Sequence, residues 1–447
     1  MSLDRKTARR LADRILGHAR RLAPGADAIV SLSYGRSANV RFARNEITSS
    51  GDVTETVAAV TLARGQRHAA STTNQTDDAS LVALVERADR LARVSPEDPE
   101  WLPPLGPQRY RVTPPQHDAA TRDLPAEPRV AAAASAIAAA KQAGVTVAGF
   151  HETSGGASAL ATSAGLFAWH ESSNVELTVT ARTPCGTGSG WAGGTANRAA
   201  DVDVSRVVAT AVDKALRSCA PRALTPGRYT VILEPQAVAE LLGFLTGSLD
   251  ARRADEGRSF FSRKGGGTRV GETLFPESIT LGSDAADPLT PGAPYSGDGL
   301  PRQALTFIDR GRIARLSYDR YWAHKQGVHA TGAPHSLHLR GGTATPEDLL
   351  AGVKRGVLIT RFWYTRWLDP KSILITGLTR DGVFLVENGA VVAPVTNFRF
   401  NESPVTMLAR ADLLGRETVR VPQHGLDLRV PALRTHDFHL ASVSDAV

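Results

Sequence analysis

The spacing of apolar residues predicts two amphipathic helices in the first fifth of the chain. The first apolar series recurs at steps of three and four residues and ends before Pro24-Gly25, as an amphipathic helix does. Its members are Ala8, Leu11, Ile15, Ala19 and Leu22. A second series with the same spacing predicts a helix over residues 78–93.

Runs of β-branched and aromatic residues between these helices predict two β-hairpins. The first is expected to turn at Gly35, between residues 28–34 and 38–43. The second is expected to turn at Arg64-Gly65, between residues 54–63 and 66–72. Residues 1–95 are therefore predicted to form an N-terminal α/β domain.

Proline density marks the end of this first domain. Nine prolines lie between residues 95 and 128, a density that neither a helix nor a central strand accepts. We therefore predict a linker over residues 96–127. The middle domain, residues 128–220, is again α/β. It is expected to contain helices near 128–143 and 202–218 and strands near 145–152, 159–162 and 175–180.

The remaining chain, residues 226–447, is predicted to be a mainly β domain. It opens with a strand over residues 229–233 and a helix from Pro235 to about Arg253. Two hairpins are expected, at Asp309-Arg-Gly311 and at Asn388-Gly389, where Asn-Gly is typical of a type I′ turn. A short helix with Thr345 as its cap is expected to close at Gly356. The predicted fold class is α+β, with α/β N-terminal and middle layers followed by a large, mainly antiparallel β domain.

The most unusual stretch is Arg361-Phe-Trp-Tyr-Thr-Arg-Trp367. On a strand its side chains would alternate, with Arg361, Trp363, Thr365 and Trp367 on one face and Phe362, Tyr364, Arg366 and Leu368 on the other. Such a strand suits a sheet that has core on one side and a partner or substrate on the other. A fully buried strand with stacked arginines is the alternative.

Charge and cysteine content exclude several classes of protein. The 447 residues carry a net charge of +7, but nearly all the positive charge is scattered arginine, so we expect no nucleic-acid partner. Two cysteines can form at most one bridge, and no Cys-x-x-Cys pair occurs, which favours a reducing cytoplasm. Charged residues interrupt the N-terminus, and no apolar stretch is long enough to span a bilayer. We therefore expect neither export nor a membrane partner.

Familiar catalytic motifs are absent from the sequence. It contains no His-Glu-x-x-His zinc motif and no Gly-x-Ser-x-Gly nucleophile turn. The glycine-rich stretch from Gly186 to Gly194 lacks a lysine and is interpreted as a mobile or sheet-crossing loop. Four histidines are close in sequence but match no metal-ligand spacing, so metal binding or ordinary loop histidines both remain open. They are His324, His329, His335 and His338.

Several short motifs, in this order, resemble the TldD/PmbA family, also called the modulator-of-gyrase family. They are Arg41-Phe-Ala-Arg-Asn45, Thr162-Ser-Ala-Gly-Leu166, Pro226-Gly-Arg-Tyr229, Gly257-Arg-Ser-Phe260, Gly377-Leu-Thr-Arg-Asp-Gly382 and Asn397-Phe-Arg-Phe-Asn-Glu-Ser403. Single pieces are weak, but their order and spacing cover nearly the whole chain.

The resemblance implies a zinc metallopeptidase with a His-Glu-x-x-x-His motif on the helix that follows Pro226-Gly-Arg-Tyr229, and a cysteine ligand near the C-terminus. Here Gly243 stands at the first histidine, Phe244 at the glutamate and Ser248 at the second histidine. Glycine offers no ligand atom, phenylalanine no base, and serine only a poor ligand for zinc. No cysteine follows Cys219. We therefore expect no cofactor in this chain.

The chain thus resembles the zinc-less PmbA/TldE-type subunit, which pairs with a TldD-like, zinc-bearing sibling to form a heterodimeric, cytoplasmic peptidase. In that family the C-terminal domains enclose a chamber for unfolded or leader-type peptides. This chain would supply chamber wall, substrate contacts and assembly surface. The predicted peptide contacts are Arg361, Arg366, Arg380, Asp381, Asn397 and Arg399. Arginines beside a sheet edge can bind carboxylates of an added peptide strand, although the same residues could merely tie strands together.

Two other functions remain open from the sequence. One is a scaffold homodimer that binds peptides without cleaving them. The other is a self-sufficient hydrolase with an unrecognised site, for which no nucleophile and base stand in register. The sequence identifies neither the substrate nor the partner.

Overall fold

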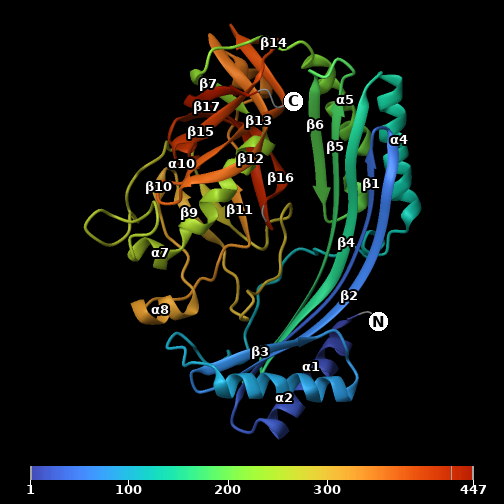
Figure 1. Cartoon of the computed structure of the whole chain (residues 1–447). Helices are drawn as coiled ribbons and strands as arrows, with labels where there is room; N and C mark the ends of the chain where they lie inside the picture. The colour runs from blue at the N-terminus through green and yellow to red at the C-terminus, as the bar shows by residue number, and fades with distance from the viewer. Residues whose placement is uncertain (1–2, 424, 445–447) are drawn as a thin grey trace.

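The structure is a computed structural model that describes residues 3–423 and 425–444. About 25% of the chain is helix and 42% strand, which confirms the predicted α+β class. Figure 1 shows a long, curved sheet on one side and the C-terminal part on the other, joined at the top through β6 and α5. No helix in the described part of the chain is both long and apolar enough to cross a membrane.

The first sheet has six antiparallel strands in the order β3-β2-β1-β4-β5-β6. Their bounds are β1 Asp27–Ala43, β2 Glu46–Arg64, β3 Arg67–Thr73, β4 Thr146–Thr162, β5 Phe167–Arg182 and β6 Ser189–Ala196. Strands from the predicted N-terminal and middle domains meet in this sheet, because β1 pairs with β4 over 14 residue pairs from Ile29↔Thr162 to Phe42↔Gly149. The domain boundaries drawn from the sequence stay a prediction.

Long strands replace several predicted turns. The hairpin expected at Gly35 is wrong, because β1 continues through Gly35 while pairing with β2 and β4 on its two sides. The predicted strands 145–152 and 159–162 are likewise parts of one strand, β4. The hairpin at Arg64-Gly65 is confirmed by the β2–β3 pairing. Glycine and serine often occur in turns, but here they lie in the middle of an uninterrupted strand.

Four long helices cover one face of this sheet. They are α1 Arg5–Leu22, α2 Asp78–Val94, α4 Ala126–Gln142 and α5 Val204–Arg217. The first two pack on one end of the sheet through Leu11, Ile15 and Leu84. The last two pack on the other end, where Ile137 and Val208 join the core. The opposite face carries none of these helices, and Figure 1 shows it turned toward the C-terminal domain.

Residues 95–118 have no regular secondary structure and lead to the single turn α3 Ala119–Arg122. Tyr110 donates a hydrogen bond to the Gly299 carbonyl at 2.9 Å, so this proline-rich segment touches the C-terminal domain. It also borders the first sheet, where the Gln116 side chain contacts His170. The segment is therefore an ordered strap between the two sheets.

The C-terminal domain is built on an eleven-stranded sheet with mainly antiparallel pairing, as predicted. Its strands are β7 Gly227–Leu233, β8 Leu281–Ser283, β9 Leu305–Asp309, β10 Arg312–Ile313, β11 Ser336–Leu339, β12 Arg355–Asp369, β13 Leu374–Glu387, β14 Ala390–Pro394, β15 Asn397–Glu402, β16 Ala411–Gln423 and β17 Leu426–Ser444. Among these strands, as far as the described residues go, only β7 with β12 and β11 with β17 pair in parallel. The remaining helices are α6 Pro235–Leu242, α7 Ala251–Asp255, α8 Arg320–Gln326, α9 Pro346–Leu350 and α10 Pro404–Ala409, with 3₁₀ turns η1 Ala199–Asp201 and η2 Gly243–Leu249.

The predicted turns and the predicted helix cap in this domain are confirmed, whereas two predicted helix lengths are wrong. Asn388 and Gly389 both have positive φ, 49° and 79°, as a type I′ turn requires, and the β9–β10 hairpin also forms. Thr345 caps α9 in a capping box with Asp348. The predicted end at Gly356 is wrong, because α9 ends at Leu350 and Gly356 lies in β12. The helix predicted to run unbroken from Pro235 is also wrong, because it changes to a 3₁₀ turn at Gly243.

Candidate functional site

The segment at the expected zinc-motif position is apolar in the structure. Gly243 ends α6 and begins the 3₁₀ turn η2. The Phe244 ring packs edge-to-face on the Trp367 ring, with centroids 5.0 Å apart. Ser248 is buried, and its carbonyl accepts a hydrogen bond from the Ser259 hydroxyl at 2.8 Å. Glycine and phenylalanine hold no donor atoms, so these three positions do not fit a zinc site.

Glu240 is a buried carboxylic acid on α6, one turn before Phe244. It accepts hydrogen bonds from the Gln236 amide at 2.8 Å and from the backbone N–H of Phe362. The Arg361 Nη2 atom lies 3.3 Å from Glu240 Oε1, and both side chains are nearly buried. Burial raises the pKa of the Glu240 carboxyl to about 7, although the positive charge of Arg361 opposes the shift. Helix α6 is thereby held to β12 by a carboxyl that is partly neutral near pH 7.

Arg361 lies between two tryptophans where the two sheets meet. Its guanidinium carbon is 4.6 Å from the Trp191 ring centre on β6 and 5.4 Å from that of Trp363 on β12. On the neighbouring strand β13, Arg380 lies 5.3 Å from the Trp363 ring centre. These side chains form one stack of cations and indoles across the junction.

Asp381 extends this junction to the first sheet. It is 3% exposed and accepts a hydrogen bond from the Ser189 hydroxyl of β6. Arg380 Nε lies 3.9 Å from Asp381 Oδ1. Asp381 has φ 56° and Gly382 φ 119°, so β13 is kinked where it meets β6. We call Arg361, Arg380, Asp381, Trp191 and Trp363 the junction cluster.

The six predicted peptide contacts therefore fall into two groups. Arg361, Arg380 and Asp381 come together in the junction cluster, where they also tie the two sheets to each other. The other three are not members of this cluster. Asn397 on β15 accepts a hydrogen bond from the Thr379 hydroxyl at 3.2 Å, whereas Arg366 and Arg399 are exposed. Their role in peptide binding stays a prediction.

The aromatic stretch departs from the alternation expected of a strand. The pairing of β12 with β13 shifts between Trp363 and Arg366, and Tyr364 has φ 56°. From Trp363 onward both predicted faces are exposed: Trp363 46%, Tyr364 63%, Trp367 44% and Leu368 51%. The alternative of a fully buried strand is therefore wrong beyond Phe362. Strand β7 pairs with β12 only from Gly356 to Ile359, which leaves the outer part of β12 without it.

The glycine-rich stretch from Gly186 to Gly194 is only partly the expected loop, because Gly186 to Gly188 lie in a turn and the rest is strand. Residues 189–196 form β6 at the edge of the first sheet. A Cβ atom at Gly188 would collide with the Ala215 carbonyl on α5, and one at Gly190 would collide with the Ala211 carbonyl. The glycines therefore allow α5 to pack closely on β6. Cys185 and Cys219 meet beside this edge as a disulfide that spans 34 residues of sequence.

The four histidines are not gathered into one site. His324 lies on α8 and His329 follows it, both exposed, whereas His338 on β11 is buried. The His338 ring nitrogen contacts the hydroxyls of Thr290 and Ser336 at 2.6 and 2.9 Å. Within residues 3–423 and 425–444, no group of three or more His, Cys, Asp or Glu side chains could hold a metal ion.

His170 and His335 predict a loss of stability in acid. Burial and the charge of Arg302 lower the pKa of His170 to about 4 and that of His335 to about 3. The unfolded chain, with histidine pKa near 6.5, then binds more protons than the folded chain below pH 6.5. Each histidine is therefore expected to lower the free energy of unfolding by about 3 kcal/mol between pH 7 and pH 4, so the two together by about 6 kcal/mol.

Urea-induced unfolding at a series of pH values measures this effect. In the double variant His170→Asn/His335→Asn, the free energy of unfolding should fall less steeply as the pH is lowered. The control His324→Asn, at an exposed position, should leave this pH dependence unchanged. An unaltered slope in the double variant would contradict the assignment.

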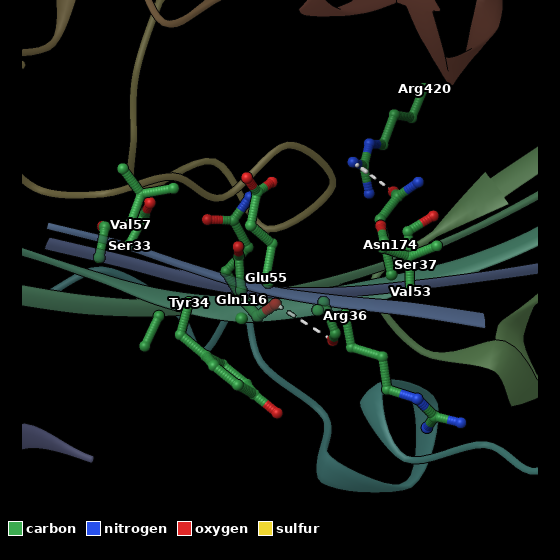
Figure 2. A pocket seen from close by; sticks show the side chains of 18 residues that line it. Ser33, Tyr34, Arg36, Ser37, Val53, Glu55, Val57, Gln116, Asn174 and Arg420 are labelled. Atoms are coloured by element: carbon green, nitrogen blue, oxygen red, sulfur yellow. Dashed lines mark hydrogen bonds between the residues drawn. The ribbon is translucent and has the colours of Figure 1, made fainter. Parts of the chain in front are cut away.

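One cavity lies on the face of the first sheet that carries no helix, and a second lies at the β6 edge between α5 and the C-terminal domain. The first has a volume of about 490 Å³ and is floored by short side chains of β1, β4 and β5, including Ser33, Ser154 and Ser172. Figure 2 shows Ser33, Glu55 and Asn174 on the cavity side of the strands, while Tyr34 and Arg36 point to the other side. The second, about 640 Å³, is lined by Trp191, the Lys214–Glu234 ion pair and the loop around Leu289.

Crystal structures of three proteins share this three-part α+β architecture over nearly the whole chain. TldE from Thermococcus kodakarensis aligns with a TM-score of 0.88 at 18% identity, covering 97% of this chain and all of that one. A candidate modulator of DNA gyrase from Thermotoga maritima aligns with a TM-score of 0.85 at 18% identity, covering 97% of this chain and 100% of that one. Another candidate modulator of DNA gyrase, from Bacteroides thetaiotaomicron, aligns with a TM-score of 0.82 at 18% identity, covering 99% of this chain and 100% of that one. At this identity the likeness shows the fold.

Family models identify the chain more closely. Three models of the PmbA/TldA metallopeptidases match it in order: domain 1 over residues 28–92, the central domain over 120–218 and the C-terminal domain over 226–442. The chain belongs to the PmbA/TldD metallopeptidase family. No curated protein matches it in sequence. The family resemblance read from the short motifs is thereby confirmed.

Sequence reasoning missed Trp191, Ser189 and Glu240 as parts of the junction. Trp191 and Ser189 lie in the glycine-rich stretch that suggested a loop, and only the pairing of β6 with β5 places them. Glu240 carried one usable signal, because it is the only acidic residue in the apolar helix Pro235–Leu242. A lone carboxyl in a buried helix needs a partner, which here is Arg361.

Proposed function

We propose that this chain is the zinc-less subunit of a two-subunit peptidase in the PmbA/TldD family, and that a zinc-bearing sibling carries out hydrolysis. The observation that carries this proposal is the packing of Phe244 on Trp367 at the position where the motif would place its glutamate. An aromatic contact replaces the general base, and Gly243 replaces the first ligand. The segment from α6 to η2 keeps its place in the fold but lacks the zinc ligands and the general base of the motif.

The outer part of β12 supports a role in assembly. Trp363, Tyr364, Trp367 and Leu368 are each exposed by more than 40% and lie within six residues of one another. Large aromatic side chains of this kind are enriched in protein–protein contacts, because they bury much apolar area with few rotatable bonds. Arg366 stacks on Tyr364 at 4.1 Å and adds a positive charge to the surface. This surface is suited to contact with a partner subunit.

The proposed contribution to peptide binding rests on the six residues predicted from the sequence. Arg366 and Arg399 are exposed and can reach carboxylates of a bound peptide. The other four residues tie neighbouring strands together, so they would act chiefly by holding the sheet in position rather than by contacting the peptide. They are Arg361, Arg380, Asp381 and Asn397. The proposed substrates are unfolded or leader-type peptides, and this chain supplies wall and contacts rather than the hydrolytic step.

Co-expression tests the division of labour. The chain is purified alone and together with a family sibling from the same source that carries His-Glu-x-x-x-His. Zinc content and cleavage of one unstructured peptide are measured in both samples. We expect zinc and chelator-sensitive cleavage only in the co-purified complex.

The matched control is a sibling whose motif glutamate is changed to glutamine, which should assemble with this chain and cleave nothing. Cleavage by this chain alone would overturn the proposal. So would full activity of the sibling without this chain, because the chain would then contribute nothing to the reaction.

A further inference from the structure

The only two cysteines of the chain meet beside β6, at the edge of the first sheet. Cys185 lies in the turn between β5 and β6 and is exposed, whereas Cys219 follows the end of α5 and is half-buried. The sulfur of an exposed disulfide can be attacked by a small thiolate from solution. Its exposure therefore favours a bond that forms and breaks in the folded protein.

Packing of the turn on α5 brings the two cysteines together without help from the bond. The Thr183 N–H donates a hydrogen bond to the Gly188 carbonyl at 3.0 Å and closes the turn. Gly188 is buried so closely against α5 that a Cβ atom there would collide with the Ala215 carbonyl. The two thiols of the reduced form are thus expected to remain neighbours and to be able to close again.

Threonine hydroxyls surround both sulfur atoms. The Thr183 and Thr187 hydroxyls lie 3.0 and 3.1 Å from the Cys185 sulfur, and each lies 3.8 Å from the Cys219 sulfur. A hydroxyl that donates to sulfur stabilises the thiolate, which is the reactive form in disulfide exchange. Cys185 is the more exposed of the two, so it is the sulfur that an oxidant meets first.

Hydrogen bonds join Cys219 to the junction cluster. Ser218, the residue before it, accepts the Ser189 N–H with its hydroxyl at 2.9 Å. The Ser189 hydroxyl in turn donates to Asp381 on β13. On the other side of Cys219, the Arg222 N–H donates to a carbonyl at the end of β14, at 2.9 Å. Cys219 therefore lies where the chain crosses from the first sheet to the C-terminal domain.

We propose that Cys185 and Cys219 are a reversible thiol–disulfide pair whose oxidant is a small-molecule disulfide such as oxidised glutathione, and whose bond steadies the contact between the two sheets at the junction cluster. The Cys185 thiolate attacks one sulfur of the oxidant, forms a mixed disulfide and releases one thiolate. The Cys219 thiolate then attacks the Cys185 sulfur, forms the intramolecular bond and releases the second thiolate. The two protein thiols are oxidised, and the two protons they lose are taken up by the two thiols formed from the oxidant.

The bond restrains the backbone on both sides of the pair. The Cα atoms of Cys185 and Cys219 are 7.4 Å apart, slightly beyond the usual span of a disulfide, so the bond tethers the turn to the end of α5 without slack. It also closes a loop over 34 residues of sequence that contains β6 and α5. The dithiol form lacks this tether, and β6 is then expected to open more often.

Thiol counting in glutathione buffers tests the reversibility. The folded chain is equilibrated with oxidised or reduced glutathione, quenched in acid, and its free thiols are alkylated and counted by mass spectrometry. We expect no free thiol in oxidised glutathione and two in an excess of reduced glutathione. A bond that reduced glutathione leaves intact in the folded chain, or thiols that stop at mixed disulfides, would overturn the proposal.

Single cysteine variants test the order of the two steps. Cys219→Ser should stop at a mixed disulfide between Cys185 and glutathione, because the second sulfur is missing. Cys185→Ser should react with oxidised glutathione at least about tenfold more slowly, because the remaining sulfur is half-buried. Equal rates in the two variants would contradict the assignment of Cys185 as the attacking sulfur.

Hydrogen exchange in the two redox forms tests the link to the junction. We expect the bond to slow exchange of the backbone amides in β6 and at residues 380–382 at least about fivefold, and to leave β3 unchanged. In Ser218→Ala the bond should still form, but residues 380–382 should no longer respond to it. The matched control is Ser205→Ala, at an exposed position on the same helix, which should respond as the original chain does. Equal exchange in both redox forms of the original chain would refute the effect on the junction.

Discussion

Replacing Phe362 by alanine is expected to lower the free energy of unfolding of the C-terminal domain by about 3 to 5 kcal/mol. Phe362 is 1% exposed, and its ring centre lies 4.3 Å from that of Phe400 and 5.7 Å from that of Phe438. Removing the ring leaves a cavity beside two rings that belong to two other strands, β15 and β17. Because β15 and β17 hold the other two rings, the cavity cannot collapse without moving the sheet.

Urea-induced unfolding followed by tryptophan fluorescence measures this loss. The matched control is Tyr364→Ala, two residues further along β12, where the side chain is 63% exposed. That variant should lose less than about 1 kcal/mol, since little apolar area is withdrawn from the core. A loss below about 1 kcal/mol for Phe362→Ala would show that the three rings do not form a rigid core.

Replacing Arg361 by alanine is expected to destabilise the protein in a way that depends on pH. The variant leaves Glu240 buried without its cation, so a charged carboxylate there costs about 3 kcal/mol. Protonation removes that cost. The pKa of Glu240 in the original chain is already raised to about 7, and loss of Arg361 raises it further. The defect should therefore be largest at pH 8 and smaller at pH 5.

The sign follows from proton binding. A carboxyl whose folded pKa is above its unfolded value contributes most to stability below pH 4.5, and that contribution is lost as pH rises through 7. Urea-induced unfolding at pH 5 and pH 8 measures the difference. Adding Glu240→Gln to Arg361→Ala should remove most of the pH dependence, and Arg366→Ala is the exposed arginine control. A defect of equal size at both pH values would contradict the role of Glu240.

These two residues also show why the site was only partly predictable. The alternation around Phe362 and Arg361 predicted a strand, and β12 is one. The bulge at Tyr364 was not predictable, because a non-glycine residue with positive φ leaves no local signal in Tyr-Thr-Arg. Nor could the sequence show that Arg361 pairs with Glu240, since 121 residues separate them and only the packing of α6 on β12 joins them.

The same contrast holds for the first sheet. Apolar periodicity predicted α1 and α2 correctly, because each helix buries one stripe and its caps are local. The cavity above Gly35 was hidden, since Gly35 and the serines around it look like turn residues in sequence. Their meaning depends on β4 and β2 pairing on the two sides of β1, which are contacts distant in sequence.

The sequence by itself determined the α+β class, the family and the absence of histidine and glutamate at Gly243 and Phe244, because these depend on residue identity and short-range pattern. Only the tertiary structure decided what replaced them. It places Phe244 on Trp367, brings Arg361 between Trp191 and Trp363, and opens a cavity above Gly35. Each of these features joins strands or helices far apart along the chain, and burial and contact distance exist only once the two sheets are folded together.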